Sequence, residues 1–249
     1  MLGCSQIAHG ESRTQRRSVK EKVFTAGVML SLAGCGGILC GQISKGAPPE
    51  VVRLDSVQNL ELIDGKAEIR TYRGRRAVHF LPLPNHPVDY FTLAIIADTD
   101  FKDGTLEIEV AGAPGKEADA DNRGFVGLAF HVQDRGSRSE LFYLRPTNGR
   151  AKDQLRRNHS VQYESAPDFS WKRLRTETPG LYESYADLQP GVWTKMKVVV
   201  SGTEARLYVN GAAQPTLVVN DLKLGATHGQ IALWAYGGTE AYFSNLKVY

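Results

Sequence analysis

Three features of this chain of 249 residues predict an all-β fold in which two antiparallel sheets pack face to face. Short runs rich in Val, Ile, Leu and aromatic residues recur along the chain, and turn-forming residues separate them. Some runs alternate apolar and polar residues, as over 104–110. No amphipathic helix of convincing length is visible after residue 42. Many short strands without intervening helices favour a two-sheet sandwich over an α/β fold.

The first strands are expected in the following order. Residues 60–72 contain Asp64-Gly65 between two strand-like runs, which predicts a hairpin. The apolar run 91–96 and the alternating run 104–110 predict two more strands, and the Gly-, Ala- and Asp-rich segment 112–122 predicts a loop. Strands are then expected at 125–132 and 141–144, with a polar turn at 134–139 between them.

The C-terminal part of the chain has the clearest strand pattern. Strands are expected at 195–200, 205–210, 216–219, 230–236 and 241–248. Asn210-Gly211 suits the positive φ angles of a tight turn. We expect Trp193 to plug one end of the sandwich, Phe243 to face the core, and Asn245 to bond a neighbouring backbone group.

The first 42 residues differ in kind from the rest and predict an export signal. Five Lys or Arg residues stand against two Glu, and an uncharged apolar run follows over 23–32. A basic segment, a short apolar segment and small residues are typical of a secretory leader. The apolar run is shorter than the roughly 20 residues that a permanent membrane-spanning helix needs. The formal net charge of +3 comes from this leader, so the remainder has no basic excess that would favour nucleic acid as a partner.

The end of the apolar run contains Leu32-Ala33-Gly34-Cys35, which resembles the lipobox of bacterial lipoproteins. The resemblance implies lipidation at Cys35 and a protein held by a lipid anchor in the periplasm or at the outer membrane. An ordinary signal peptide, cleaved nearby, is the alternative. We therefore expect a leader over 1–42, a Pro- and Gly-containing linker over 43–52, and one domain over 53–249.

All three cysteines lie before residue 43. The predicted domain therefore has no disulfide, thiolate nucleophile or cysteine-based zinc site. No dinucleotide-binding, phosphate-binding or metalloprotease motif is present, and no cofactor or metal is expected. Asp119, Asp121 and Asn122 offer oxygen ligands at a spacing that calcium could use, but such oxygens in a Gly- and Ala-rich loop are more commonly just a solvated turn, which is the favoured interpretation.

The C-terminal pattern also carries a family resemblance. Its elements are Trp193 entering a valine-rich strand, a strand ending Val209-Asn-Gly211, Gly229 leading into a strand, and Phe243-Ser-Asn245 in the last strand. This frame resembles the concanavalin A-like jelly rolls of lectins and glucanases, and within them the 3-keto-disaccharide hydrolase domain family. The resemblance implies a jelly-roll sandwich and a role in carbohydrate recognition. Fold alone does not specify function, so the site must be argued separately.

The candidate site lies in the segment 142–187, which is too long and too aromatic for a featureless connection. Flat rings beside multi-donor guanidinium groups suit the apolar faces and hydroxyls of a sugar. The residues predicted to bind the ligand are Arg145, Arg157, Tyr163, Trp171 and Tyr182. In the alternative interpretation, these aromatic residues only cover one edge of the sandwich while the arginines pair with nearby carboxylates.

Catalysis is the second hypothesis for the same segment. A hydrolase of the 3-keto type, which the resemblance implies, needs a polar acid–base group near the sugar, and Glu183, Asp187 and His159 are the candidates. Glu107 and Glu109 lack the third carboxylate of the glucanase pattern and are interpreted as solvated residues of an amphipathic strand.

The sequence therefore predicts an exported, carbohydrate-recognising β-sandwich whose membrane contact is a lipid anchor only. Hydrolysis of 3-keto-disaccharides is the first alternative. A structural or adhesion module that docks protein partners is the second.

Overall fold

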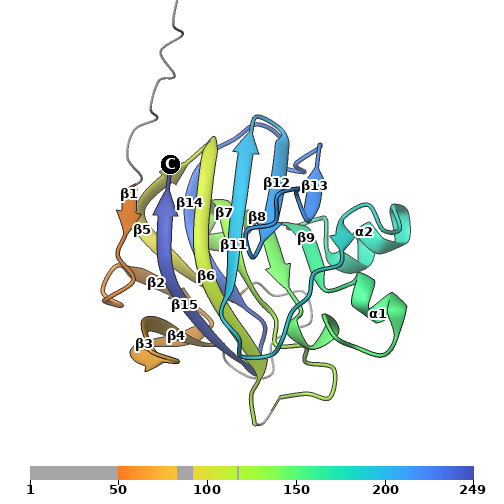
Figure 1. Cartoon of the computed structure of the whole chain (residues 1–249). Coiled ribbons are helices and arrows are strands. Elements are labelled where there is room, and N and C mark those ends of the chain that lie inside the picture. Colours follow the sequence, from red (N-terminus) through yellow and green to blue (C-terminus); the bar gives the residue numbers. More distant parts are fainter. Residues whose placement is uncertain (1–49, 83–91, 117) are drawn as a thin grey trace, which may run out of the picture. The chain divides into compact units, whose positions relative to one another are not determined.

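The computed structural model describes residues 50–82, 92–116 and 118–249. Contacts divide the chain into a unit over 1–44, which lies outside the described residues, and a unit over 45–249. The second unit is a sandwich of two antiparallel sheets, as predicted (Figure 1). The two-layer architecture is confirmed.

One layer is an eight-stranded sheet in which all pairings are antiparallel. Its order is β13 (Leu217–Val219), β12 (Glu204–Val209), β11 (Thr194–Ser201), β6 (Gly104–Pro114), β15 (Thr239–Val248), β4 (Arg75–Pro82) and β3 (Gly65–Tyr72), and β1 (Glu50–Val52) also pairs with β15.

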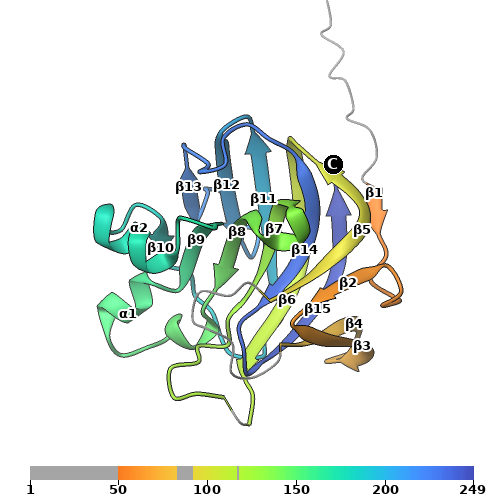
Figure 2. The same cartoon turned by 180° about the vertical axis from the view of Figure 1, so that it is seen from behind.

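The other layer is a seven-stranded sheet, and its two α-helices lie at one end (Figure 2). Its order is β10 (Glu183–Ser184), β9 (Val161–Ala166), β8 (Arg138–Leu144), β7 (Val126–Gln133), β14 (Gly229–Ala235), β5 (Leu93–Phe101) and β2 (Leu60–Ile63). The helical elements are η1 (Asp134–Gly136), η2 (Pro146–Asn148), α1 (Gln154–Asn158) and α2 (Trp171–Glu177). The views agree that α1 and α2 lie beside β9 and β10.

The main core lies between the sheets, because alternate residues of each strand point inward. In β8, Phe142 and Leu144 join this core, whereas Leu141 and Tyr143 belong to a second apolar cluster on the outer face of the seven-stranded sheet. Burying both faces of the central strands explains why 126–132 reads as a nearly continuous apolar run.

The Asp64-Gly65 hairpin prediction is wrong. β2 ends at Ile63 and β3 begins at Gly65, yet β2 pairs with β5 and β3 pairs with β4. Asp64 has a positive φ of 53°. The chain turns there, but it crosses from one sheet to the other, because long-range strand partners outweigh a local turn signal.

Two predicted contacts also need correction. Trp193 packs on the outer face of the eight-stranded sheet, where its ring lies 5.8 Å from that of Tyr72, so it does not plug the sandwich. Asn245 donates to the carboxylate of Glu109 and not to a backbone group. The expectations for Phe243 in the core and for positive φ at Asn210-Gly211 are confirmed.

The segment 142–187 is more regular than predicted. It completes β8 and adds β9 and β10 to the edge of the sheet, with α1 and α2 in the connections. Asp153 caps α1 and Ser170 caps α2 through side-chain oxygens that accept backbone N–H groups. Both helices are shorter than two turns, so no amphipathic period is visible in the sequence.

Candidate functional site

A pocket of about 670 Å³ lies where the segment 142–187 meets the outer face of the seven-stranded sheet. Its size falls within the range of roughly 300–1,000 Å³ that is usual for small-molecule sites. Five aromatic residues line it, namely Phe125, Tyr143, Trp171, Trp234 and Tyr236. The charged residues of its wall are Arg123, Arg145, Arg175, Asp119, Asp121 and Glu164, together with His159.

Three neighbouring strands build the aromatic floor. Gly127 of β7 pairs on one side with Trp234 of β14 and on the other with Tyr143 of β8. The missing side chain of Gly127 leaves room between its neighbours, and the two rings approach to 4.7 Å between centroids. The aromatic floor therefore depends on a glycine between the two aromatic residues on the neighbouring strands.

Arg145, directly after β8, connects this floor to the wall. Its Nη2 donates to the Tyr143 hydroxyl at 2.9 Å, and its Nη1 donates to the carbonyl oxygen of His159 at 3.1 Å. The guanidinium also lies 6.0 Å from the ring centroid of Trp171. Because the side chain is buried, these contacts fix its position.

The Tyr143 hydroxyl donates to Oε1 of Glu164 at 2.5 Å while it accepts from Arg145. Burial raises the pKa of Tyr143 well above its ordinary value, with Glu164 adding to this and Arg145 opposing it. Tyr143 therefore stays protonated and bridges a carboxylate and a guanidinium in the pocket.

Beneath the wall lies Glu183, the first residue of β10. Arg175 of α2 donates to both of its carboxylate oxygens, at 2.8 and 2.5 Å. The Oε2 atom of Glu183 also lies 3.7 Å from Nη1 of Arg145 and 3.5 Å from Nε2 of His159. One carboxylate thus contacts three side chains of the pocket wall.

His159 follows α1 directly and has a partly exposed ring. Desolvation lowers its pKa; Glu183 and Asp153 oppose this, while Arg175 and Arg145 reinforce it. The imidazole is therefore neutral at pH 7 and can accept a proton.

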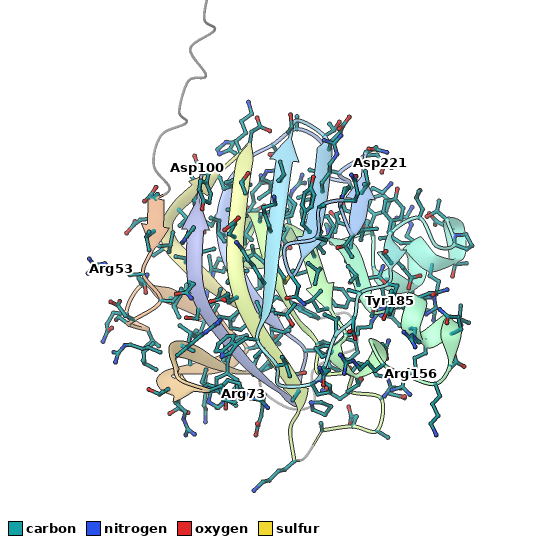
Figure 3. All side chains as sticks on the ribbon, viewed as in Figure 1. Arg53, Arg73, Asp100, Arg156, Tyr185 and Asp221 are labelled. Atoms are coloured by element: carbon teal, nitrogen blue, oxygen red, sulfur yellow. The ribbon has the colours of Figure 1, made fainter. Side chains whose placement is uncertain are left out.

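The predicted site residues fall into three groups. Arg145, His159 and Trp171 line the pocket, and Glu183 lies beneath them. Arg157 and Asp187 lie outside it: Arg157 donates to the Tyr185 hydroxyl at 2.9 Å, and Asp187 forms a two-bond pair with Arg150. Figure 3 shows Tyr185 on the flank of the molecule that carries α1 and α2.

Tyr163 and Tyr182 do not line the pocket, because they belong to the core between the sheets. The Tyr163 hydroxyl donates to Oε2 of Glu140 at 2.5 Å, and the Tyr182 hydroxyl donates to Asp221 at 2.7 Å. Cys35, the predicted lipidation site, lies outside the described residues.

Sequence reasoning missed the floor of the pocket. Phe125, Trp234 and Tyr236 fall in predicted strands and were not predicted to bind a ligand. Tyr143, Glu164 and Arg175 lie in the candidate segment 142–187, but they were not among its predicted ligand-binding or catalytic residues. The alternation along β8 and β14 contained a signal, since Tyr143 and Trp234 have the opposite parity to the core residues Phe142 and Leu233.

Within the described residues, no three His, Cys, Asp or Glu side chains come close enough together to hold a metal ion. Asp119 and Asp121 lie on the pocket rim, and Asp121 pairs with Arg123 at 2.9 Å. None of the helices in the described part of the chain has the length and apolarity needed to cross a membrane.

Solved structures with the same fold are distant in sequence. The carbohydrate binding module CBM66 from Bacillus subtilis is 14% identical with a TM-score of 0.53, covering 77% of this chain and 96% of that one. A Bacillus subtilis protein with a galectin-like fold is 13% identical with a TM-score of 0.50, covering 79% and 92%. Curated protein sequences give no significant match. These structures confirm the jelly-roll fold.

The family comparison covers most of the sandwich. Residues 90–249 match the model of the 3-keto-alpha-glucoside-1,2-lyase-like domain, which confirms the predicted family. The family takes its description from a lyase, a different class of reaction from the hydrolysis that the resemblance implies. The chain belongs to the 3-keto-alpha-glucoside-1,2-lyase-like domain family.

Proposed function

We propose that this chain binds an uncharged sugar in the pocket between α2 and the outer face of the seven-stranded sheet. The observation that carries the proposal is the combination of five aromatic residues with fixed hydrogen-bonding groups around one cavity. Aromatic rings pack against the C–H faces of a sugar, and guanidinium, imidazole and carboxylate groups bond its hydroxyls. The shared fold with a carbohydrate binding module supports the same assignment.

The charges of the pocket wall argue for an uncharged ligand. Three guanidinium groups face three carboxylates, and His159 is neutral. Arg145 and Arg175 are also paired with Glu183. A phosphorylated sugar or a uronic acid would find no excess positive charge, whereas a neutral glycoside needs none.

Binding of neutral glycosides, measured by calorimetry, tests the proposal. Trp171→Ala removes a ring from the wall, and we expect the Kd to rise roughly tenfold or more. Tyr185→Ala is the matched control, because Arg157 lies over Tyr185 at 5.0 Å outside the pocket, much as Arg175 lies over Trp171 at 4.8 Å inside it. Equal affinities of the two variants for glycosides would refute the site. Co-purification with a protein partner, in the absence of any sugar binding, would favour a module that docks proteins.

Family membership favours a second function, elimination from a 3-keto-glucoside. The C3 carbonyl makes the C2 hydrogen acidic, so a base can remove it as a proton. The electron pair left behind forms the C1=C2 double bond while the C1–O bond breaks, and the leaving group takes up a proton and departs as an alcohol. Neutral His159 on the pocket wall is the residue best suited to accept the C2 proton.

The products distinguish elimination from hydrolysis. Elimination yields a conjugated enone that absorbs ultraviolet light, whereas hydrolysis yields a saturated keto sugar. We expect His159→Gln to abolish enone formation and His228→Gln to retain it, because His228 is exposed and pairs with Asp100. Turnover should fall on acidification through the lowered pKa of His159. A saturated product, or full activity of His159→Gln, would refute this assignment.

We also propose that the chain is exported and lipidated at Cys35, with the domain in the periplasm or at the outer membrane; the basic and apolar pattern of residues 1–42 supports this. The anchor would hold the sugar pocket at a membrane surface without a spanning helix. The measurement is fractionation of cells that produce the full chain: Cys35→Ser should move the protein from the membrane pellet to the soluble fraction. A variant that still sediments with membranes would exclude the lipid anchor.

A further inference from the structure

The carboxylate of Glu183 is buried below the pocket, where its side chain is 3% exposed. Its three partners come from three separate elements. Arg145 follows β8, His159 follows α1, and Arg175 lies within α2. The carboxylate therefore joins the end of one strand to both short helices.

Glu183 itself is not among the residues that line the pocket, whereas all three of its partners are. It acts on a ligand only through them. Arg145 and Arg175 carry like charges and both lie near the ring of Trp171, at 6.0 and 4.8 Å from its centroid. A carboxylate between two guanidinium groups offsets their repulsion and holds both against the same ring.

We propose that Glu183 is the positioning residue of the pocket, holding Arg145, Arg175 and His159 in one arrangement without touching the ligand. The proposal rests on the function proposed above, in which these three side chains meet the sugar. It changes the role predicted for Glu183 from acid–base catalyst to organiser. A buried carboxylate in a two-bond pair with arginine suits this role, because its geometry is rigid and its oxygens are occupied.

The pKa of His159 reports on this arrangement, because it depends on the charged groups around the ring. Glu183 and Asp153 favour the protonated ring, while Arg145, Arg175 and the partial burial of the ring disfavour it. Removing the negative charge of Glu183 therefore lowers the pKa of His159 further. Removing the positive charge of Arg175 raises it.

The experiment is a titration of the His159 ring by NMR in the full chain, combined with calorimetric binding of neutral glycosides. In Glu183→Gln we expect the His159 midpoint to move to lower pH and the glycoside Kd to rise roughly 10- to 100-fold. Glu177→Gln is the matched control, because Glu177 also pairs with an arginine of α2, at 2.9 Å from Nε of Arg173, but is exposed and outside the pocket. It should leave both values unchanged.

Arg175→Gln is the second variant, and it should move the His159 midpoint to higher pH. Shifts in opposite directions are a signature that general loosening of the fold does not produce. A folded Glu183→Gln with an unmoved midpoint would overturn the proposal. If Glu183→Gln does not fold, an unmoved or lowered midpoint in Arg175→Gln would overturn it. Wild-type protein that binds no glycoside refutes the proposed function alone, since the titration is measured without ligand.

Discussion

At the scale of single residues, Tyr143 connects the two halves of the pocket's polar network. Its hydroxyl lies between Glu164 and Arg145, and Arg145 in turn lies near Glu183, which binds Arg175. Carboxylates and guanidinium groups therefore alternate, with one neutral hydroxyl in the series. Such alternation allows charged groups to remain buried, because each has an opposite charge or a donor beside it.

Tyr143→Phe tests this network without changing the shape of the floor. Arg145 and Glu164 each lose one hydrogen bond in a buried environment, so we expect the free energy of unfolding to fall by about 1–3 kcal/mol. The measurement is unfolding in urea. Tyr208→Phe is the matched control, since that ring packs under Lys197 on the other sheet, and it should change little. Equal stability of both variants would show that the Tyr143 hydroxyl contributes nothing.

At the scale of elements, the floor depends on the register of β14, β7 and β8. That register places Gly127 between Trp234 and Tyr143. A Cβ atom on Gly127 would lie 2.3 Å from the carbonyl oxygen of Phe142 and 2.6 Å from Cβ of Tyr143. Both contacts are shorter than real Cβ contacts, and the first is with rigid backbone.

Gly127→Ala should therefore displace β8 from β7 and tilt the ring of Tyr143. We expect a loss of about 1–3 kcal/mol in the free energy of unfolding, as for overpacked cores, together with weaker binding of glycosides. Urea unfolding and calorimetry measure the two effects. An alanine variant with wild-type stability would show that the strands adjust freely.

At the scale of the whole molecule, two histidines couple stability to pH. His131 is buried in the seven-stranded sheet and donates from Nε2 to the Lys102 carbonyl oxygen at 2.8 Å. Desolvation lowers the pKa of His131, as it does for His159. The unfolded chain takes up these protons near the ordinary value of 6.5, and the folded chain only at lower pH. Protonation therefore favours unfolding.

We expect the Tm to be highest above pH 6.5 and to fall as the pH drops through the lowered pKa values of the two histidines. Burial raises the pKa of Glu140, so its protonation at low pH stabilises the folded state and opposes the effect of the histidines. A histidine variant is therefore needed to isolate their contribution. His131→Asn suits the positive φ of 50° at this position and should reduce the drop in Tm. A pH profile unchanged in His131→Asn would contradict this origin.

Sequence patterns predicted most of the strands because each strand has its own period of two, which needs no knowledge of its partners. Which strands pair with one another was harder to predict from the sequence. Asp64-Gly65 has the composition of a hairpin, yet β5 and β4 compete for the strands on either side of it. The helices α1 and α2 are too short for a helical period, and their side-chain caps were the only local signal.

The candidate site was predicted only in part, because residues close in sequence are easier to group than residues that long-range strand pairing brings together. Arg145, His159 and Trp171 belong to one segment rich in rings and arginines, so composition pointed to them. Tyr143 and Trp234 lie far apart in the sequence, and the pairing of both strands with β7 at Gly127 brings their rings together. Tyr163 had the right chemistry, but the parity of β9 turns it into the core and turns Glu164 outward.

The sequence by itself determined the sandwich class and the segment that carries much of the pocket wall, because these follow from local periodicity and composition. The family followed from the resemblance of the C-terminal motifs. Only the tertiary structure decided which face each side chain occupies and which distant strands are neighbours. Strand register is a long-range property, and a shift of one residue would exchange the pocket floor for the core.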